Sequence, residues 1–181
     1  MIIKSRKLKE LKYQLLNEIN YFYTESQVFY KFNLIFIALF AIILIYISII
    51  DIKSLSIGLK ELIILLIFTI TYFTFKLFFS GNMVLFDIFK GIIFSLLFFL
   101  IIILLTKNKG IGIGDMIFFS LCSINIGFIN SLEAILIAFI LGMIYSIFLI
   151  LLRKANLKTK LPFIPFLSIG ILLSLFFKCV Y

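Results

Sequence analysis

Long apolar runs separated by short polar stretches dominate the sequence from residue 32 onward. Each run is close to the ~20 residues that an α-helix needs to cross the hydrocarbon layer of a bilayer. Backbone groups in hydrocarbon must be paired within the chain, and the sequence shows no ten-residue alternating strands, so the runs predict helices. The expected spans are residues 33–50, 61–79, 84–105, 116–130, 132–152 and 162–178, with a tight turn near Asn130-Ser131 between the fourth and the fifth.

The first 31 residues follow a different pattern. Their apolar positions recur every three or four residues, as on one face of a helix, at Leu8, Leu11, Leu15, Ile19 and Phe22, and lysines flank this face. This pattern favours an interfacial helix on anionic lipid, and a basic arm that recruits a partner is the alternative. We therefore expect a basic amphipathic segment at residues 1–31, with no cleaved signal peptide. One all-α domain at residues 32–181 should follow, a polytopic bundle of about six transmembrane helices.

Composition supports a membrane protein, because 64% of the residues are hydrophobic and only 14% are charged. The net charge of +9 does not indicate nucleic-acid binding, since the basic residues are dispersed among short loops. Near the ends of the spans they concentrate in the loops after the first, third and fifth spans, which should face the cytoplasm. That orientation places the basic amino-terminal segment outside, in conflict with its own charge.

Two aspartates stand at the edges of predicted spans. Asp51 ends the first span and Asp115 opens the fourth, so two further crossings return the chain to the same membrane side. An acid at the edge of a span is costly to keep and is a candidate functional residue. Gly112 and Gly114 precede Asp115 and would let the backbone approach a ligand closely.

Several other chemistries are excluded. The chain has no histidine, and its two cysteines are far apart, so histidine-based triads, HExxH zinc sites and paired-cysteine zinc sites cannot form. We expect no metal ion and no cofactor.

A pair of carboxylates that share a site holds one proton near neutral pH. The ionised acid can then take a proton from water while the other polarises a peptide carbonyl, which hydrolyses the peptide without a covalent intermediate. Asp115 should be the more acidic of the two, because the first turn of a helix favours an anion. Two alternatives remain open: a small proton- or cation-coupled transporter that uses the same acids, and a non-catalytic pilus or secretion assembly factor.

Three segments, in order, resemble the type IV prepilin peptidases, which are GxGD aspartyl proteases of membranes. They are Asp51-Ile52-Lys53-Ser54-Leu55-Ser56-Ile57, Lys109-Gly110-Ile111-Gly112-Ile113-Gly114-Asp115, and Leu161-Pro162-Phe163-Ile164-Pro165-Phe166-Leu167. The resemblance covers about Ile45 to Gly170 and implies that Asp51 and Asp115 are the catalytic pair. Pro162 and Pro165 would shape the wall of the active site, or they only start the last helix.

The resemblance also implies a substrate. It would be a prepilin-like or pseudopilin precursor, whose leader is cut at the cytoplasmic face of the cell membrane just before a hydrophobic helix. Gly58 stands where the family usually has proline, and Ile117 where it often has lysine. The chain looks like a short form that lacks the cysteine-rich region of the methylating members, so we expect an unmethylated product.

Overall fold

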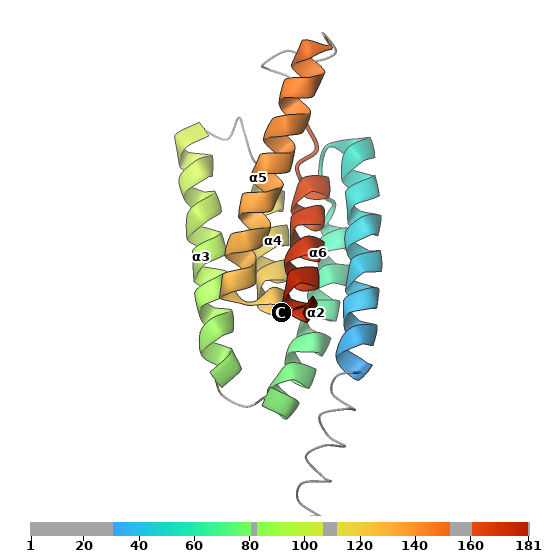
Figure 1. The fold of residues 1–181 in the computed structure, drawn as a ribbon, viewed down its shortest axis with the longest axis vertical. Coiled ribbons are helices and arrows are strands. Elements are labelled where there is room, and N and C mark those ends of the chain that lie inside the picture. Colours follow the sequence, from blue (N-terminus) through green and yellow to red (C-terminus); the bar gives the residue numbers. More distant parts are fainter. Residues whose placement is uncertain (1–30, 81–82, 107–111, 153–160, 181) are drawn as a thin grey trace, which may run out of the picture. The chain divides into compact units, whose positions relative to one another are not determined.

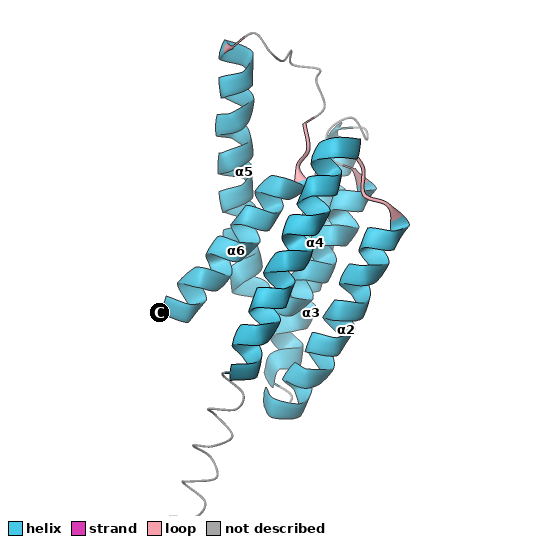
Figure 2. Cartoon of the chain, turned by 90° about the vertical axis from the view of Figure 1, so that its right-hand side faces the viewer, coloured by secondary structure: helices cyan, strands magenta, loops and turns pink. Residues whose placement is uncertain are grey.

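The computed structural model describes residues 31–80, 83–106, 112–152 and 161–180 of the chain. Every regular element within these ranges is an α-helix, as Figures 1 and 2 show. The prediction of an all-α membrane bundle is therefore confirmed.

The chain divides into two compact units, Met1–Leu39 and Phe40–Tyr181. All packing described below lies within the second unit. The amphipathic segment predicted for residues 1–31 falls outside the described residues, except for Lys31.

Six helices make up the described part of the chain. In order they are Lys31–Ser54, α2 (Leu59–Ser80), α3 (Met83–Thr106), α4 (Ile113–Ile126), α5 (Phe128–Leu151) and α6 (Ile164–Val180). Four of them are long and apolar enough to cross a membrane, whereas α4 and α6 are shorter. Large apolar side chains are exposed along the long helices, as contact with lipid requires. The chain is a multi-pass membrane protein.

Helix α4 lies at the centre of the second unit and packs against α2, α3, α5 and α6 (Figure 1). Phe119 of α4 belongs to an aromatic core. In this core, Phe99 of α3 contacts both Phe119 and Phe163, the residue before α6. With 14 residues, α4 is about 21 Å long, less than the ~30 Å of a bilayer's hydrocarbon. Both ends of this short helix therefore need polar partners from the chain itself.

The break between α4 and α5 differs from the prediction. The sequence suggested a turn near Asn130-Ser131, but α4 ends at Ile126 and α5 begins at Phe128. The chain turns at Gly127, whose φ of 84° and ψ of 177° are almost restricted to glycine. Asn130 and Ser131 fit inside α5 because each side chain donates a hydrogen bond to the carbonyl four residues earlier, at 2.7 and 2.6 Å.

Side chains from neighbouring helices bond to the backbone on both sides of Gly127. On α3, the Asp87 carboxylate accepts a hydrogen bond from the Phe128 N–H at 3.3 Å, at the start of α5. On α2, Lys76 Nζ donates to the Asn125 carbonyl at 3.1 Å, at the end of α4. A helix break next to hydrocarbon is tolerated when the protein supplies such partners.

We expect Gly127→Ala to destabilise the protein by about 1–3 kcal/mol, because a side chain is strained at this φ and ψ. The new Cβ would also collide with the Asp87 carboxylate. Thermal unfolding in detergent, followed by size-exclusion chromatography, measures the effect. Gly142→Ala is the matched control, because its Cβ would meet Phe166 at an ordinary 3.7 Å. Equal stability of the two variants would contradict the analysis of this turn.

Candidate active site

The structure brings Asp51 and Asp115 together. Asp51 lies in the last turn of the helix Lys31–Ser54, and Asp115 lies in the first turn of α4. They are close enough for the negative charge of Asp51 to act on the Asp115 carboxylate. The two acids that the sequence predicts on one membrane side therefore share a site, and their catalytic role stays a prediction.

The Asp51 carboxylate binds the start of α6. Its side chain is only 4% exposed, and its Oδ2 atom accepts a hydrogen bond from the Ile164 N–H at 3.2 Å. Ile164 is the first residue of α6, where backbone N–H groups lack partners within the helix. The partial positive charge at this helix end thus lies beside Asp51.

Pro165 helps to explain why the Ile164 amide is available. The carbonyl of Phe163 already accepts the N–H groups of Phe166 and Leu167, at 3.1 and 3.2 Å. Pro165 has no N–H. The N–H of Ile164 is therefore the one N–H group in the first turn of α6 that has no hydrogen-bond partner within the helix. Pro162 and Pro165 flank this amide, so the segment both starts the last helix and borders Asp51.

Sequence reasoning missed Ile164, because an apolar side chain gives no sign that its backbone amide meets an acid. The available signal was Pro165, which marks a helix start with an unpaired amide before it. That signal does not say which residue will bind the amide.

Asp115 caps its own helix. Its Oδ2 atom accepts a hydrogen bond from the Gly112 N–H at 3.0 Å, and the Gly112 carbonyl accepts the N–H groups of Asp115 and Met116 at 3.2 and 3.4 Å. The arrangement is half of a capping box. Capping alone accounts for an acid at this position, but it does not account for a second acid beside it.

Asp115 lies outside the four helices that are long enough to cross a membrane. Burial is the main influence on the pKa of its carboxyl group. Burial raises its pKa to about 6, the Gly112 hydrogen bond opposes the increase, and the negative charge of Asp51 adds to it. The prediction that Asp115 is the more acidic of the two considered only the helix dipole, whereas burial raises the pKa of Asp115. Which of the two acids is more acidic stays a prediction.

The glycines before Asp115 are not required by the fold. Gly112 has an extended backbone, with φ of −83° and ψ of 157°, which other residues adopt readily. Gly114 lies in the first turn of α4, and a Cβ there would meet Ile57 at an ordinary 3.7 Å. A strained backbone at Gly114 is therefore not the reason for glycine. A Cβ at Gly112 would lie 3.6 Å from the Asp115 carboxylate, so glycine there keeps the backbone beside Asp115 free of a side chain.

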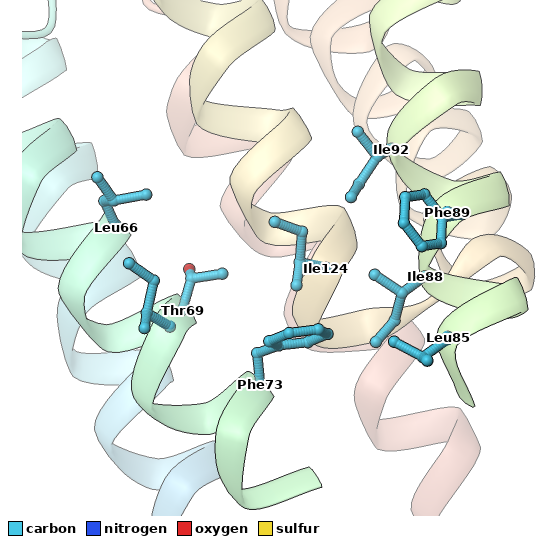
Figure 3. A pocket seen from close by; sticks show the side chains of 9 residues that line it. Leu66, Thr69, Phe73, Leu85, Ile88, Phe89, Ile92 and Ile124 are labelled. Carbon is cyan, nitrogen blue, oxygen red and sulfur yellow. The ribbon is translucent and has the colours of Figure 1, made fainter. Parts of the chain in front are cut away.

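One further feature, a cavity, lies apart from this site. An apolar cavity of about 250 Å³ lies between α2, α3 and Ile124 of α4 (Figure 3). Ile124 is nine residues after Asp115, or about 14 Å along the helix, so the cavity belongs to the other end of α4. Among the described residues, no group of three or more histidine, cysteine, aspartate or glutamate side chains could hold a metal ion.

Comparison with known proteins adds one finding. The family model described as the type IV leader peptidase family matches residues 38–147, which is more than half of the 181-residue chain. The matched segment contains Asp51 and Asp115, and it ends before the proline segment that starts α6. Comparisons with curated proteins and with solved structures gave no match. On the strength of the family match, the chain belongs to the type IV leader peptidase family.

Proposed function

We propose that this leader-peptidase-like protease is an intramembrane aspartyl endopeptidase that uses Asp51 and Asp115. The proximity of the two acids, inside the segment that matches a peptidase family, carries the proposal. Its substrates are prepilin-like or pseudopilin precursors, cut between a basic leader and a hydrophobic helix. No metal ion or cofactor takes part in this mechanism.

The hydrogen bonds of the two carboxylates suit an acid–base pair. One oxygen of each is held by a backbone amide, Asp51 Oδ2 by Ile164 and Asp115 Oδ2 by Gly112. The Oδ1 atoms make no hydrogen bond within the described part of the chain. Each acid is thus oriented by the backbone, with one oxygen left for water or for the peptide.

The reaction then follows from one proton shared by two acids. The ionised carboxylate removes a proton from a water molecule, which attacks the peptide carbonyl while the protonated acid donates a hydrogen bond to the carbonyl oxygen. The resulting intermediate collapses when the carboxyl group that took the proton from water passes it to the leaving amine, which restores the starting state of the pair. A pKa of about 6 keeps part of the Asp115 population protonated near neutral pH.

The site should face the cytoplasm. In the sequence, lysines and arginines close to the spans concentrate in the connections after the first, third and fifth predicted spans, the connections next to which Asp51 and Asp115 lie. This orientation suits a substrate whose hydrophobic helix enters the bilayer directly after the cleaved bond.

We expect Asp51→Asn and Asp115→Asn each to reduce cleavage at least about 100-fold, because an amide cannot act as an acid or a base. Co-expression with a prepilin-like precursor, in cells without another prepilin peptidase, measures leader removal by mass. Asp87→Asn is the matched control, since its amide oxygen can still accept the Phe128 N–H at the start of α5. Near-normal processing by either active-site variant would falsify the two-aspartate mechanism.

The pKa of Asp115 predicts how cleavage depends on pH. With the pKa of Asp115 raised to about 6, the pair keeps its shared proton below about pH 6 and loses it above, so kcat/KM should fall at higher pH toward a tenfold loss per unit. A pH–rate profile of the purified protein with a precursor peptide measures this decrease in kcat/KM. The apparent pKa of the decrease describes the pair of acids and not one of them. Chromatography at each pH checks that the protein stays folded. A midpoint near the ordinary carboxyl pKa of 3.8 would contradict the raised value.

Gly114→Ala and Gly114→Val should insert and fold but cleave at least about tenfold less, because they add a side chain to the residue before Asp115, where the substrate backbone is proposed to approach, and so misplace the peptide. Initial rates at several precursor concentrations separate this effect from a loss of protein. Gly142→Ala is again the control, because its Cβ also meets a neighbouring side chain at 3.7 Å. Full activity of Gly114→Val would show that no substrate backbone approaches this position.

A further inference from the structure

The two helices that carry Asp51 and Ile164 are joined by a second hydrogen bond one turn away. Ser48 precedes Asp51 by three residues, and Ser168 follows Ile164 by four. Their Oγ atoms lie 2.8 Å apart. Both serines are buried, with 9% and 3% of their surface exposed.

The Ser48–Ser168 bond belongs to a short chain of hydrogen bonds. Ser48 Oγ also lies 2.7 Å from the carbonyl oxygen of Leu44, one turn earlier in its own helix. The Ser48 hydroxyl carries one proton, and both the Leu44 carbonyl and the Ser168 hydroxyl are placed to accept it. Removal of either serine hydroxyl breaks the connection between the helices.

Some other buried serines bond only to their own helices, whereas Ser95 of α3 also bonds across to Ser120 of α4 at 3.2 Å. Ser174, further along α6, donates to the carbonyl of Ile171 at 2.9 Å, and Ser131 of α5 donates to Gly127. Such bonds satisfy a hydroxyl group without connecting two helices. Ser48 and Ser168 differ because they connect the helix of Asp51 to the helix whose first amide Asp51 binds.

The second bond limits how far α6 can slide along the helix of Asp51. A shift by one residue corresponds to about 1.5 Å, which would stretch the 3.2 Å Ile164–Asp51 bond beyond hydrogen-bonding distance. Where water is scarce, a hydroxyl–hydroxyl bond between helices meets little competition from solvent. Two contacts separated by one turn fix both the position and the tilt of the start of α6.

We infer that Ser48 and Ser168 are positioning residues for Asp51, which hold the Ile164 amide against its carboxylate. The inference rests on the proposed function, because it gives the two serines a role in the same peptide cleavage. The serines touch neither water nor peptide in the reaction and act only through the orientation of Asp51.

Cross-linking tests the geometry without any activity. The double variant Ser48→Cys/Ser168→Cys should form a disulfide on mild oxidation of membranes, detected as linked peptides by mass spectrometry. The pair Ser48→Cys/Ser174→Cys is the matched control and should not form one. Absence of the 48–168 link, in protein that elutes as the wild type does, would overturn the inference.

Kinetics test the positioning role. Ser48→Ala and Ser168→Ala should each lower kcat about three- to tenfold with little change in KM, as expected for loss of one interhelical hydrogen bond. The double variant should lose no more than either single one, because all three lack the same bond. Ser48→Thr keeps the hydroxyl group and should restore kcat, whereas Ser174→Ala should behave as the wild type.

A purely structural role gives a different result. It would lower the amount of folded protein and leave kcat per folded molecule unchanged, and that outcome would overturn the inference. Full activity of Ser48→Ala beside an inactive Asp51→Asn would overturn the inference and leave the proposed function intact. A wild-type protein that cleaves no prepilin-like precursor would remove the proposed function and this inference with it.

Discussion

Backbone groups at helix ends need partners, and in this protein charged side chains supply them. Asp51 binds the first amide of α6, Asp115 binds the amide before α4, Asp87 binds the first amide of α5, and Lys76 binds a carbonyl at the end of α4. In a membrane bundle little water reaches such groups, so an unpaired amide or carbonyl would be costly. The shortness of α4 and the start of α6 inside the bundle both depend on this pairing.

The candidate active site is a special case of the same constraint. Asp51 and Asp115 each close a helix end with one carboxylate oxygen, and the structure places the two acids near each other. Asp87 closes a helix end in the same way, on its own, at the Gly127 break. Helix capping therefore accounts for each acid singly, and the proximity of Asp51 to Asp115 is the feature that needs a functional explanation. Membership of a peptidase family supplies one.

Burial, more than repulsion between the two acids, sets the acidity of Asp115. Burial and the charge of Asp51 raise the pKa of Asp115, while the Gly112 amide limits the increase. A carboxyl group with a pKa of about 6 can hold or release a proton under physiological conditions. The backbone amides that cap the helices thus also tune the chemistry proposed for the pair.

The sequence by itself determined the helices, their approximate bounds and the return of Asp51 and Asp115 to one membrane side. These follow from the length of the apolar runs and from the number of crossings between the two acids, both of which are local properties of the chain. Tertiary structure alone decided which partner each helix end finds. At the Gly127 break, Lys76 and Asp87 come from other helices to bond the backbone on either side. The Ile164 amide met Asp51, and the charge of Asp51 reached Asp115, and the sequence could not show either because both interactions join residues more than 60 positions apart in the chain.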